Sequence, residues 1–196
     1  GLFVKKFMGK KKVRLVDTGS TEMNMAPVHV LCILFRLTKK KQYLDLALQF
    51  VDEFSAKDKN GEFLCGDYIN QALSDIPFFK TPKPRWESLH PIMALSELYW
   101  ITGQEKYSKA FQQIWWSIVE LDRHNNGGFS SGEQAQGNPY HQGAIETCCT
   151  IAWVALSFEM LKLTGNPIVA DEIELSTLNS VLGLHSKSGR WVTYNT

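Results

Sequence analysis

The side chains best suited to chemistry lie between residues 122 and 149. This stretch holds two carboxylates, Glu133 and Glu146, and the vicinal pair Cys148-Cys149. Glu133 stands in a Gly-rich segment, where a semi-buried carboxyl can act as a general acid or base. A solvated loop acid is the alternative interpretation of the same residue, and the local sequence alone does not choose between the two.

Glu146 and the two cysteines stand at the start of an apolar run that predicts a helix. On a helix Glu146 and Cys149, three residues apart, share a face, whereas Cys148 diverges from them unless the first turn is irregular. A carboxylate and a thiolate at one helix N-terminus can hold Zn²⁺, and the helix dipole favours the thiolate. The pattern equally fits a carboxylate that completes backbone donors beside two small buried side chains.

Other residues suited to chemistry have a structural interpretation when taken singly. His90 and His141 are each more often structural than catalytic, and His29 lies in an apolar helical pattern that predicts a core histidine. The Trp115-Trp116 pair favours packing over sugar stacking. The sequence holds no phosphate-binding glycine loop and no nucleophilic serine elbow, which argues against a nucleotide enzyme or a serine hydrolase.

The elements that must position these residues are predicted to be helices in antiparallel pairs. Apolar residues recur at helical spacing in residues 23–37 and 43–54, 89–101 and 107–121, and 144–163 and 168–182. Each pair is joined at a Thr that follows Leu or Ile, namely Thr38, Thr102 and Thr164, and Gly follows the last two. This weak repeat indicates helical hairpins around an axis, as an open solenoid or a closed α/α toroid.

Two long irregular segments, residues 58–85 and 122–143, are rich in Gly and Pro. Loops longer than about 12–15 residues are uncommon in compact domains and are usually functional. We therefore expect one end of the helical bundle to carry the site. Residues 189–195 alternate weakly and predict one short strand near the C-terminus. The predicted fold class is thus all-α with a short C-terminal strand.

The overall composition excludes several classes of protein. The chain has 196 residues, 44% hydrophobic and 21% charged, and a net charge of +1. A net charge this small supplies no electrostatic attraction for nucleic acid, and no apolar run approaches the roughly 20 residues of a membrane span. We therefore expect neither nucleic acid nor a membrane as a partner. Four cysteines are too few for a disulfide scaffold, and free thiols favour a reducing compartment such as the cytoplasm.

Both ends of the sequence suggest a single domain that is the middle and later part of a larger one. The chain opens with Gly1-Leu2-Phe3 and stops inside the strand-like run. Six or seven helices would leave a toroid open, with exposed apolar faces that another chain must cover. We therefore expect a homo-oligomer that covers the open edge.

Several motifs, in their order along the chain, resemble glycoside hydrolase family 127, the β-L-arabinofuranosidase-like proteins. They are Gly127-Gly128, Gly132-Glu133, Glu146-Thr147-Cys148 and Tyr194-Asn195. The resemblance is continuous from about Leu89 to Thr196 and weaker over residues 23–54. It implies part of an (α/α)6 toroid that cleaves β-L-arabinofuranosides with retention, using a zinc-bound cysteine as nucleophile and a glutamate as acid/base.

By position, the resemblance implies that Glu133 is the acid/base and that Glu146 and Cys148 are two zinc ligands. It also implies that Tyr194 lies near the nucleophile and that His90 binds substrate, and His141 is a further candidate for substrate binding. The nucleophile of the family belongs to a Cys-Cys pair downstream of the segment that matches residues 191–195. Cys148-Cys149 is not that pair, because Cys148 occupies the Glu-x-Cys position, so we expect the zinc ligand set within residues 1–196 to be incomplete.

Two other functions remain open. One is a non-catalytic helical domain that binds carbohydrate or a protein through its long loops. The other is a zinc-free α/α-toroid enzyme, such as a sugar epimerase or glycuronyl hydrolase, which would use His or Asp pairs. Metal analysis, together with thiol titration with and without a chelator, separates the leading hypothesis from both.

Overall fold

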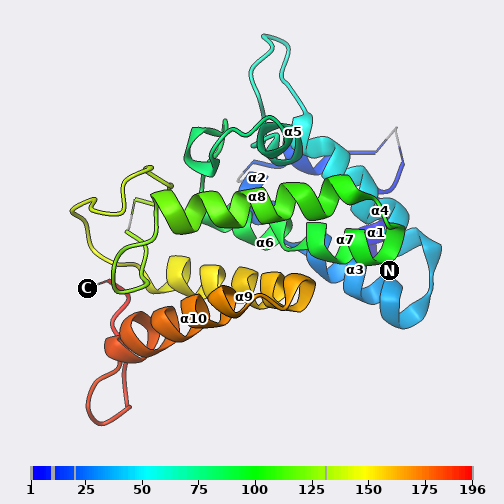
Figure 1. Cartoon of the computed structure of the whole chain (residues 1–196). Helices are drawn as coiled ribbons and strands as arrows, with labels where there is room; N and C mark the ends of the chain where they lie inside the picture. Colours follow the sequence, from blue (N-terminus) through cyan, green and yellow to red (C-terminus); the bar gives the residue numbers. More distant parts are fainter. Residues whose placement is uncertain (1, 10–11, 20, 131, 196) are drawn as a thin grey trace.

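Three antiparallel helical hairpins dominate the computed structural model, which describes residues 2–9, 12–19, 21–130 and 132–195 (Figure 1). They pair α3 (Pro27–Thr38) with α4 (Lys41–Asp52), α7 (Ala94–Thr102) with α8 (Glu105–Leu121), and α9 (Thr147–Thr164) with α10 (Pro167–Leu175). The shorter helices are α1 (Leu2–Phe7), α2 (Thr21–Asn24), α5 (Tyr68–Leu73) and α6 (Leu89–Ile92). The predicted all-α class and the three hairpins are confirmed.

The same turn closes each hairpin, as the sequence repeat predicts. Lys39, Gly103 and Gly165 each have left-handed φ angles, of 57°, 68° and 63°. Each preceding threonine donates its hydroxyl to the carbonyl four residues back, at 2.6 Å from Thr38, 2.7 Å from Thr102 and 2.8 Å from Thr164. Glycine adopts this backbone freely, which explains its place in two of the three turns.

The structure corrects several helix boundaries and does not confirm the strand: the 23–37 helix is α2 and α3, and the 89–101 helix is α6 and α7. Residues 144–146 are not helical, because Glu146 is extended (φ −101°, ψ 128°) and its N–H donates to the Phe129 carbonyl at 2.9 Å. After Leu175 the chain continues as a π-helical turn, Ser176–Val181, instead of regular α-helix. Within the described part of residues 189–195, isolated bridges to His185 and Glu146 take the place of the expected strand.

A column of aromatic rings connects the core to the loops. Trp115 of α8 stacks on Trp153 of α9 at 5.2 Å, and Phe129 packs on Trp153 at 5.3 Å and on Trp86 at 4.8 Å. Trp115 is fully buried and donates its indole N–H to Ser157 at 2.9 Å, which confirms a packing role. The rings hold Trp86 and the Phe129 loop against the start of α9.

Helix α9 is apolar on nearly all sides, and among the described residues it alone is long and apolar enough to cross a membrane. The sequence predicts no span. A buried core helix passes the same length and composition test, and Trp153 and Leu156 of α9 are fully buried. Ile151 and Phe158 on its other face are exposed, as is Val30 of α3. The predicted homo-oligomer would cover such side chains, and that association stays a prediction.

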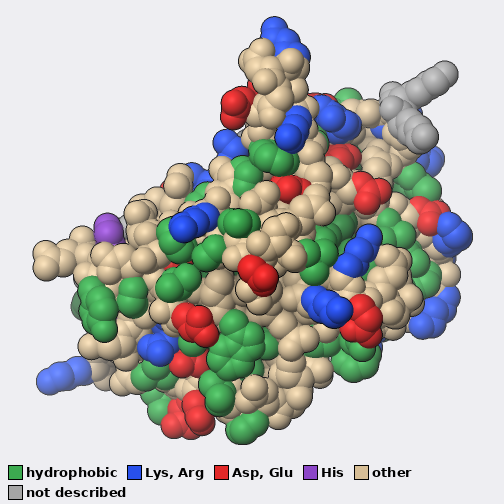
Figure 2. Space-filling model, turned by 45° about the horizontal axis from the view of Figure 1, so that its top comes forward, with side chains coloured by type: hydrophobic (Ala, Val, Ile, Leu, Met, Phe, Trp, Pro, Cys, Tyr) green, Lys and Arg blue, Asp and Glu red, His purple; other side chains and the backbone are tan. Residues whose placement is uncertain are grey.

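Acidic and basic side chains are interspersed on the face drawn in Figure 2, without a broad field of one sign. This mixed surface agrees with the small net charge of +1.

The loop between α8 and α9 is fastened at Asp122. This residue follows the last turn of α8, and its Oδ1 accepts the backbone N–H groups of Gln136 and Gly137, both at 2.7 Å. Its other oxygen, Oδ2, is buried without a hydrogen-bond partner in the described structure. Burial raises the pKa of Asp122 to about 6, although the two backbone hydrogen bonds oppose the rise.

Asp122→Asn is expected to stabilise the fold at pH 7.5. The folded pKa of about 6 exceeds the ordinary aspartate value, so the stability that Asp122 contributes is present at low pH and lost as pH rises through 6. Asparagine keeps the two acceptor bonds without burying a charge, so we expect a gain of about 1–2 kcal/mol at pH 7.5 and little gain near pH 4. Urea unfolding at both pH values measures this, and destabilisation at pH 7.5 would contradict it.

Candidate active site

A pocket of about 460 Å³ opens where the start of α9 meets the 84–90 segment and the Gly-rich loop. Its polar lining consists of Arg85, Trp86, Glu87, His90, Glu133, Glu146, Cys148, Cys149 and Tyr194. The structure therefore brings five of the predicted site residues together, although they come from four separate parts of the chain. The sixth, His141, does not line this pocket.

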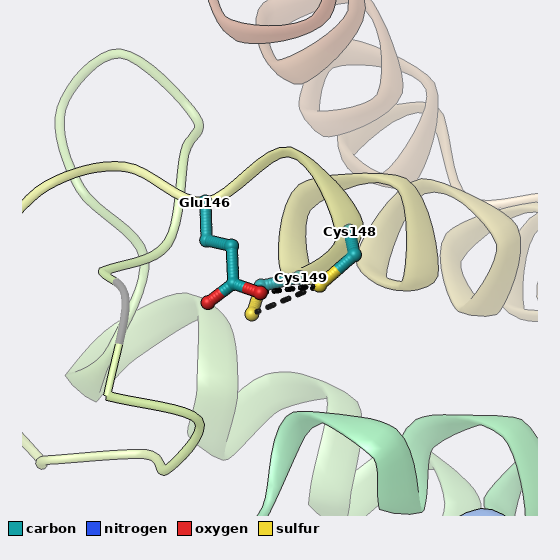
Figure 3. A group of neighbouring side chains, drawn as sticks. All are labelled: Glu146, Cys148 and Cys149. Carbon is teal, nitrogen blue, oxygen red and sulfur yellow. Dashed lines mark hydrogen bonds between the residues drawn. The ribbon is translucent and has the colours of Figure 1, made fainter. Parts of the chain in front are cut away.

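The start of α9 brings together three side chains of the types that can bind a metal, Glu146, Cys148 and Cys149 (Figure 3). Glu146 precedes the helix, so its extended backbone lets the carboxylate fold back over the first turn. Cys148 Sγ lies 2.7 Å from Glu146 Oε1 and 4.0 Å from Cys149 Sγ. The exception that the sequence leaves open, an irregular start of the helix, is what the structure has, because Glu146 is the extended residue before α9 and not part of its first turn.

Tyr194 covers this cluster from the C-terminal segment. Its hydroxyl donates to Glu146 Oε1 at 2.5 Å and lies 3.2 Å from Cys148 Sγ. Burial alone would raise the pKa of Glu146, but hydrogen bonds from Cys148, Tyr194 and Cys149 outweigh it and hold that pKa below its ordinary value. The carboxylate is therefore ionised and able to accept a cation.

Thr147 fastens the Tyr194 segment to α9. Its backbone N–H donates to the Tyr194 carbonyl at 2.9 Å, and its hydroxyl lies 2.8 Å from the Thr193 carbonyl and 3.0 Å from that of Tyr194. A helix N-terminus has unpaired N–H donors, so this contact satisfies one of them while it positions the tyrosine. The Glu-Thr-Cys motif thus contains a carboxylate, a thiol and, between them, the residue that anchors the Tyr194 segment.

The three donors suit zinc better than a hard cation. The Glu146 oxygen and the two cysteine sulfurs all lie within 4.8 Å of one another. Thiolates with one carboxylate form a soft donor set that zinc accepts in tetrahedral sites. Cys148 is exposed to the pocket and Cys149 is buried, and burial raises the pKa of both thiols. A zinc ion would replace these protons, as metal binding to thiols generally does.

A second group of possible donors, His29, Glu97 and Glu159, lies between α3, α7 and α9. Both carboxylates already have cationic partners, since Arg36 pairs with Glu97 at 2.8 Å and Lys162 pairs with Glu159 at 2.7 Å. Burial lowers the pKa of His29, and this effect is larger than the rise that the two carboxylates cause. The group fits an interior charge network with a neutral histidine, and it contains no thiolate to favour zinc.

Glu133 reaches the pocket from the Gly-rich loop, of which Ser131 lies outside the described residues. Its backbone is left-handed (φ 62°), and its side chain is 55% exposed instead of semi-buried. The carboxylate pairs with Arg85, which also contacts Glu87 at 3.0 Å. The guanidinium thus fixes the position of Glu133 at the pocket rim.

The two histidine candidates differ in position. His90 lines the pocket, and burial lowers its pKa despite the nearby Glu87, so its imidazole is neutral at neutral pH. A neutral imidazole can accept or donate a hydrogen bond to a ligand hydroxyl. His141 lies elsewhere in the loop, near Gly143, and its Nδ1 is buried without a partner in the described structure. Its role in substrate binding stays a prediction.

Two charged residues of the pocket lining, Arg85 and Glu87, have no site role in the sequence analysis. Both flank a tryptophan at the end of a long Pro-rich loop, which is the signal that could have identified them. Cys149, which the helical spacing places on the same face as Glu146, joins the cluster with its sulfur 4.0 Å from that of Cys148.

The chain matches the family model described as "Beta-L-arabinofuranosidase, GH127 catalytic domain" over residues 3–196. No curated protein matches it significantly. Among solved structures it is similar to a GH127 β-arabinofuranosidase, with 22% identity, a TM-score of 0.72, and coverage of 99% of this chain and 30% of that chain. It is also similar to a structure titled glycoside hydrolase (19% identity, TM-score 0.70, 93% and 33% coverage).

A third similar structure is a GH127 β-L-arabinofuranosidase from Geobacillus stearothermophilus T6, with 18% identity, a TM-score of 0.71, and coverage of 99% of this chain and 33% of that chain. At these identities the structural likeness shows a shared fold. The chain spans about a third of the length of these relatives. Since the family model covers nearly the whole sequence, the chain belongs to the GH127 family of glycoside hydrolases.

Proposed function

We propose that this chain supplies the acid/base and part of the zinc site of a retaining β-L-arabinofuranosidase, built on an (α/α)6 toroid. The observation that carries the proposal is the convergence of Glu133 with Glu146 and Cys148 on one pocket. A retaining glycosidase needs an acid/base and a nucleophile beside the same scissile bond. The lining of this pocket offers a proton donor and a place for a metal-activated thiolate.

In this proposal Glu133 gives its proton to the leaving-group oxygen and then takes one from the attacking water. Arg85 holds the carboxylate in place through their ion pair. In the same pocket Glu146 and Cys148 would hold zinc, whose chemical contribution is to lower the pKa of a bound thiol to a value useful at neutral pH. Tyr194 orients Glu146 through its hydroxyl, and neutral His90 binds a sugar hydroxyl.

The nucleophilic thiolate in this proposal belongs to the Cys-Cys pair that the family resemblance places after the Trp191–Asn195 segment. Cys32 and Cys65 cannot replace it, because both are buried away from the pocket and burial raises the pKa of each to about 12. By "active enzyme" we mean this chain together with the segment that carries that pair. Residues 1–196 alone are expected to bind zinc weakly and to show no hydrolysis.

Proton NMR of the first sugar released tests the function directly. The active enzyme is expected to hydrolyse an aryl β-L-arabinofuranoside and to release the β-anomer first, because two inversions at the anomeric carbon restore its configuration. A zinc chelator should abolish turnover, and added zinc should restore it. Initial release of the α-anomer, or turnover unaffected by the chelator, would contradict the proposal and favour a zinc-free toroid enzyme. Sugar binding without hydrolysis would favour a binding domain.

A further inference from the structure

The interior group of His29, Glu97 and Glu159 has no part in the proposed function. Each residue comes from a different helix, α3, α7 and α9, and one donor atom from each lies within 4.8 Å of the others. Glu97 and Glu159 are buried, with 5% and 7% of their surface exposed. Carboxylates at such positions are paired with cations or bind metals, because an isolated charge is costly to remove from water.

The cations that pair with these carboxylates reach them from the surface. Arg36 contacts Glu97 at 2.8 Å and Lys162 contacts Glu159 at 2.7 Å. The side chains of Arg36 and Lys162 are 54% and 63% exposed, and both residues lie in the last turn of their helices. A long, exposed side chain gains little from an ion pair and returns to water easily. A divalent cation can therefore take the place of both.

His29 offers the third donor atom in the form that a metal needs. Its Nε2 is buried, has no hydrogen-bond partner in the described structure, and lies 3.9 Å from Glu159 Oε1. Burial lowers the pKa of His29, so the imidazole is neutral at neutral pH although two carboxylates lie beside it. The neutral imidazole is the metal-binding form of histidine.

A pocket of about 490 Å³ gives access to the two carboxylates. It is lined by Arg36, Glu97, Trp100, Glu159 and Lys162. None of these five residues lines the pocket that holds Glu133 and Cys148, so the two sites are separate. A hydrated ion can thus reach Glu97 and Glu159 without passing the proposed zinc site, and such an entry path is a requirement for a metal site.

We propose that His29, Glu97 and Glu159 form a second metal site, which binds a divalent first-row cation, Mn²⁺ or Fe²⁺, in exchange for the contacts of Arg36 and Lys162. The two carboxylates balance the charge of the ion. The imidazole disfavours Ca²⁺ and Mg²⁺, which take oxygen ligands, and zinc is drawn to the thiols of α9 instead.

The bound ion would connect the three helices that lead to the candidate active site. Ala26 immediately precedes α3 and Cys148 lies in the first turn of α9, and both line the pocket that holds Glu133. Helix α7 packs against both α3 and α9. The second metal site is thus a structural site, and it does not depend on the proposed function.

The test measures Mn²⁺ binding to the unmodified chain by the electron paramagnetic resonance signal of the free ion. Thiolates bind Mn²⁺ poorly, so the α9 cluster contributes little. We expect one Mn²⁺ per chain and, in Glu159→Gln, an affinity lower by about 100-fold or more, because loss of an outer-shell partner alone costs 10–100-fold. His29→Gln should act in the same direction, which keeps the test valid if one variant does not fold.

Two matched variants control for general effects. Glu172→Gln makes the same change at another buried glutamate, which pairs with Arg123 at 2.7 Å on α10 and lies outside the group. Cys148→Ser alters the α9 cluster. Neither should change Mn²⁺ affinity.

Lys162→Met is expected to act in the opposite direction. It removes the ammonium that competes for Glu159 and keeps a long apolar side chain, so Mn²⁺ should bind about 2–5-fold more tightly, the usual worth of an exposed ion pair. Mn²⁺ should also raise the Tm of the unmodified chain and leave that of Glu159→Gln unchanged, because a ligand that binds only the folded state stabilises it.

Each outcome decides the matter without any measurement of turnover. No saturable binding, or equal affinity in the unmodified chain and in both Glu159→Gln and His29→Gln, would overturn the second metal site and leave the proposed function standing. Loss of binding in Cys148→Ser would place the ion at the α9 cluster and overturn it too. Weaker binding in Glu159→Gln or His29→Gln, with tighter binding in Lys162→Met, would support it.

Discussion

Glu133→Gln is expected to lower kcat/KM of the active enzyme by about 10²–10⁴-fold, the usual contribution of a general acid or base. Glutamine has nearly the same shape and can still accept a hydrogen bond from Arg85, so the loss isolates the missing proton. The side chain is exposed, and we therefore expect the free energy of unfolding to change little. Steady-state kinetics and urea unfolding of the same preparation measure both quantities.

The leaving group gives this experiment a sharper readout. A disaccharide needs protonation of its departing oxygen, whereas a nitrophenolate leaves readily without a proton. If Glu133 is the acid, the glutamine variant loses far more activity on the disaccharide than on a nitrophenyl glycoside. If Glu133 only positions Arg85, both substrates lose activity equally. Glu62→Gln makes the same chemical change on an exposed residue of the 58–85 loop and serves as the control.

The sequence predicts the helical hairpins well because the signals are local. The 3.6-residue spacing of apolar side chains and the Thr hydroxyl bonds at Thr38, Thr102 and Thr164 all act within one or two turns. The C-terminal strand is a different case. Alternation of side chains over residues 189–195 does not identify a neighbouring strand to pair with. In the described chain Val192 and Asn195 each form only an isolated β-bridge.

The sequence predicts which residues belong to the candidate site, but it predicts poorly how they lie relative to one another. Glu133, Glu146 and Cys148 are identifiable from the motifs, but their meeting depends on contacts between distant segments. Arg85 enters the site because the 84–86 segment pairs with the 133–135 segment, which no local pattern reveals. Glu146 lies off the regular helix for a local reason, since this one extended residue before α9 changes the direction of its carboxylate.

Cys148→Ser is the variant that decides whether the α9 cluster is a metal site. Loss of an outer-shell partner typically costs 10–100-fold in metal affinity, so loss of the thiolate itself is expected to cost more than about 100-fold. Competition with a chromophoric chelator measures zinc affinity on residues 1–196, without any need for turnover. Serine is close to cysteine in size, and Cys148 is exposed, so circular dichroism should show an unchanged helical fold.

Cys149→Ala is the matched comparison, because its sulfur lies 4.0 Å from that of Cys148 but is buried behind it. The family resemblance makes Cys148 the ligand and leaves Cys149 out, which predicts a much smaller loss of zinc affinity in Cys149→Ala.

Tyr194→Phe removes the hydroxyl that orients Glu146. Its loss of zinc affinity should lie between those of the two cysteine variants, at about 10–100-fold, as for an outer-shell partner. Equal zinc affinity in the unmodified chain and in Cys148→Ser would mean that the first turn of α9 holds no metal, and the carboxylate would then be a capping group beside two ordinary thiols.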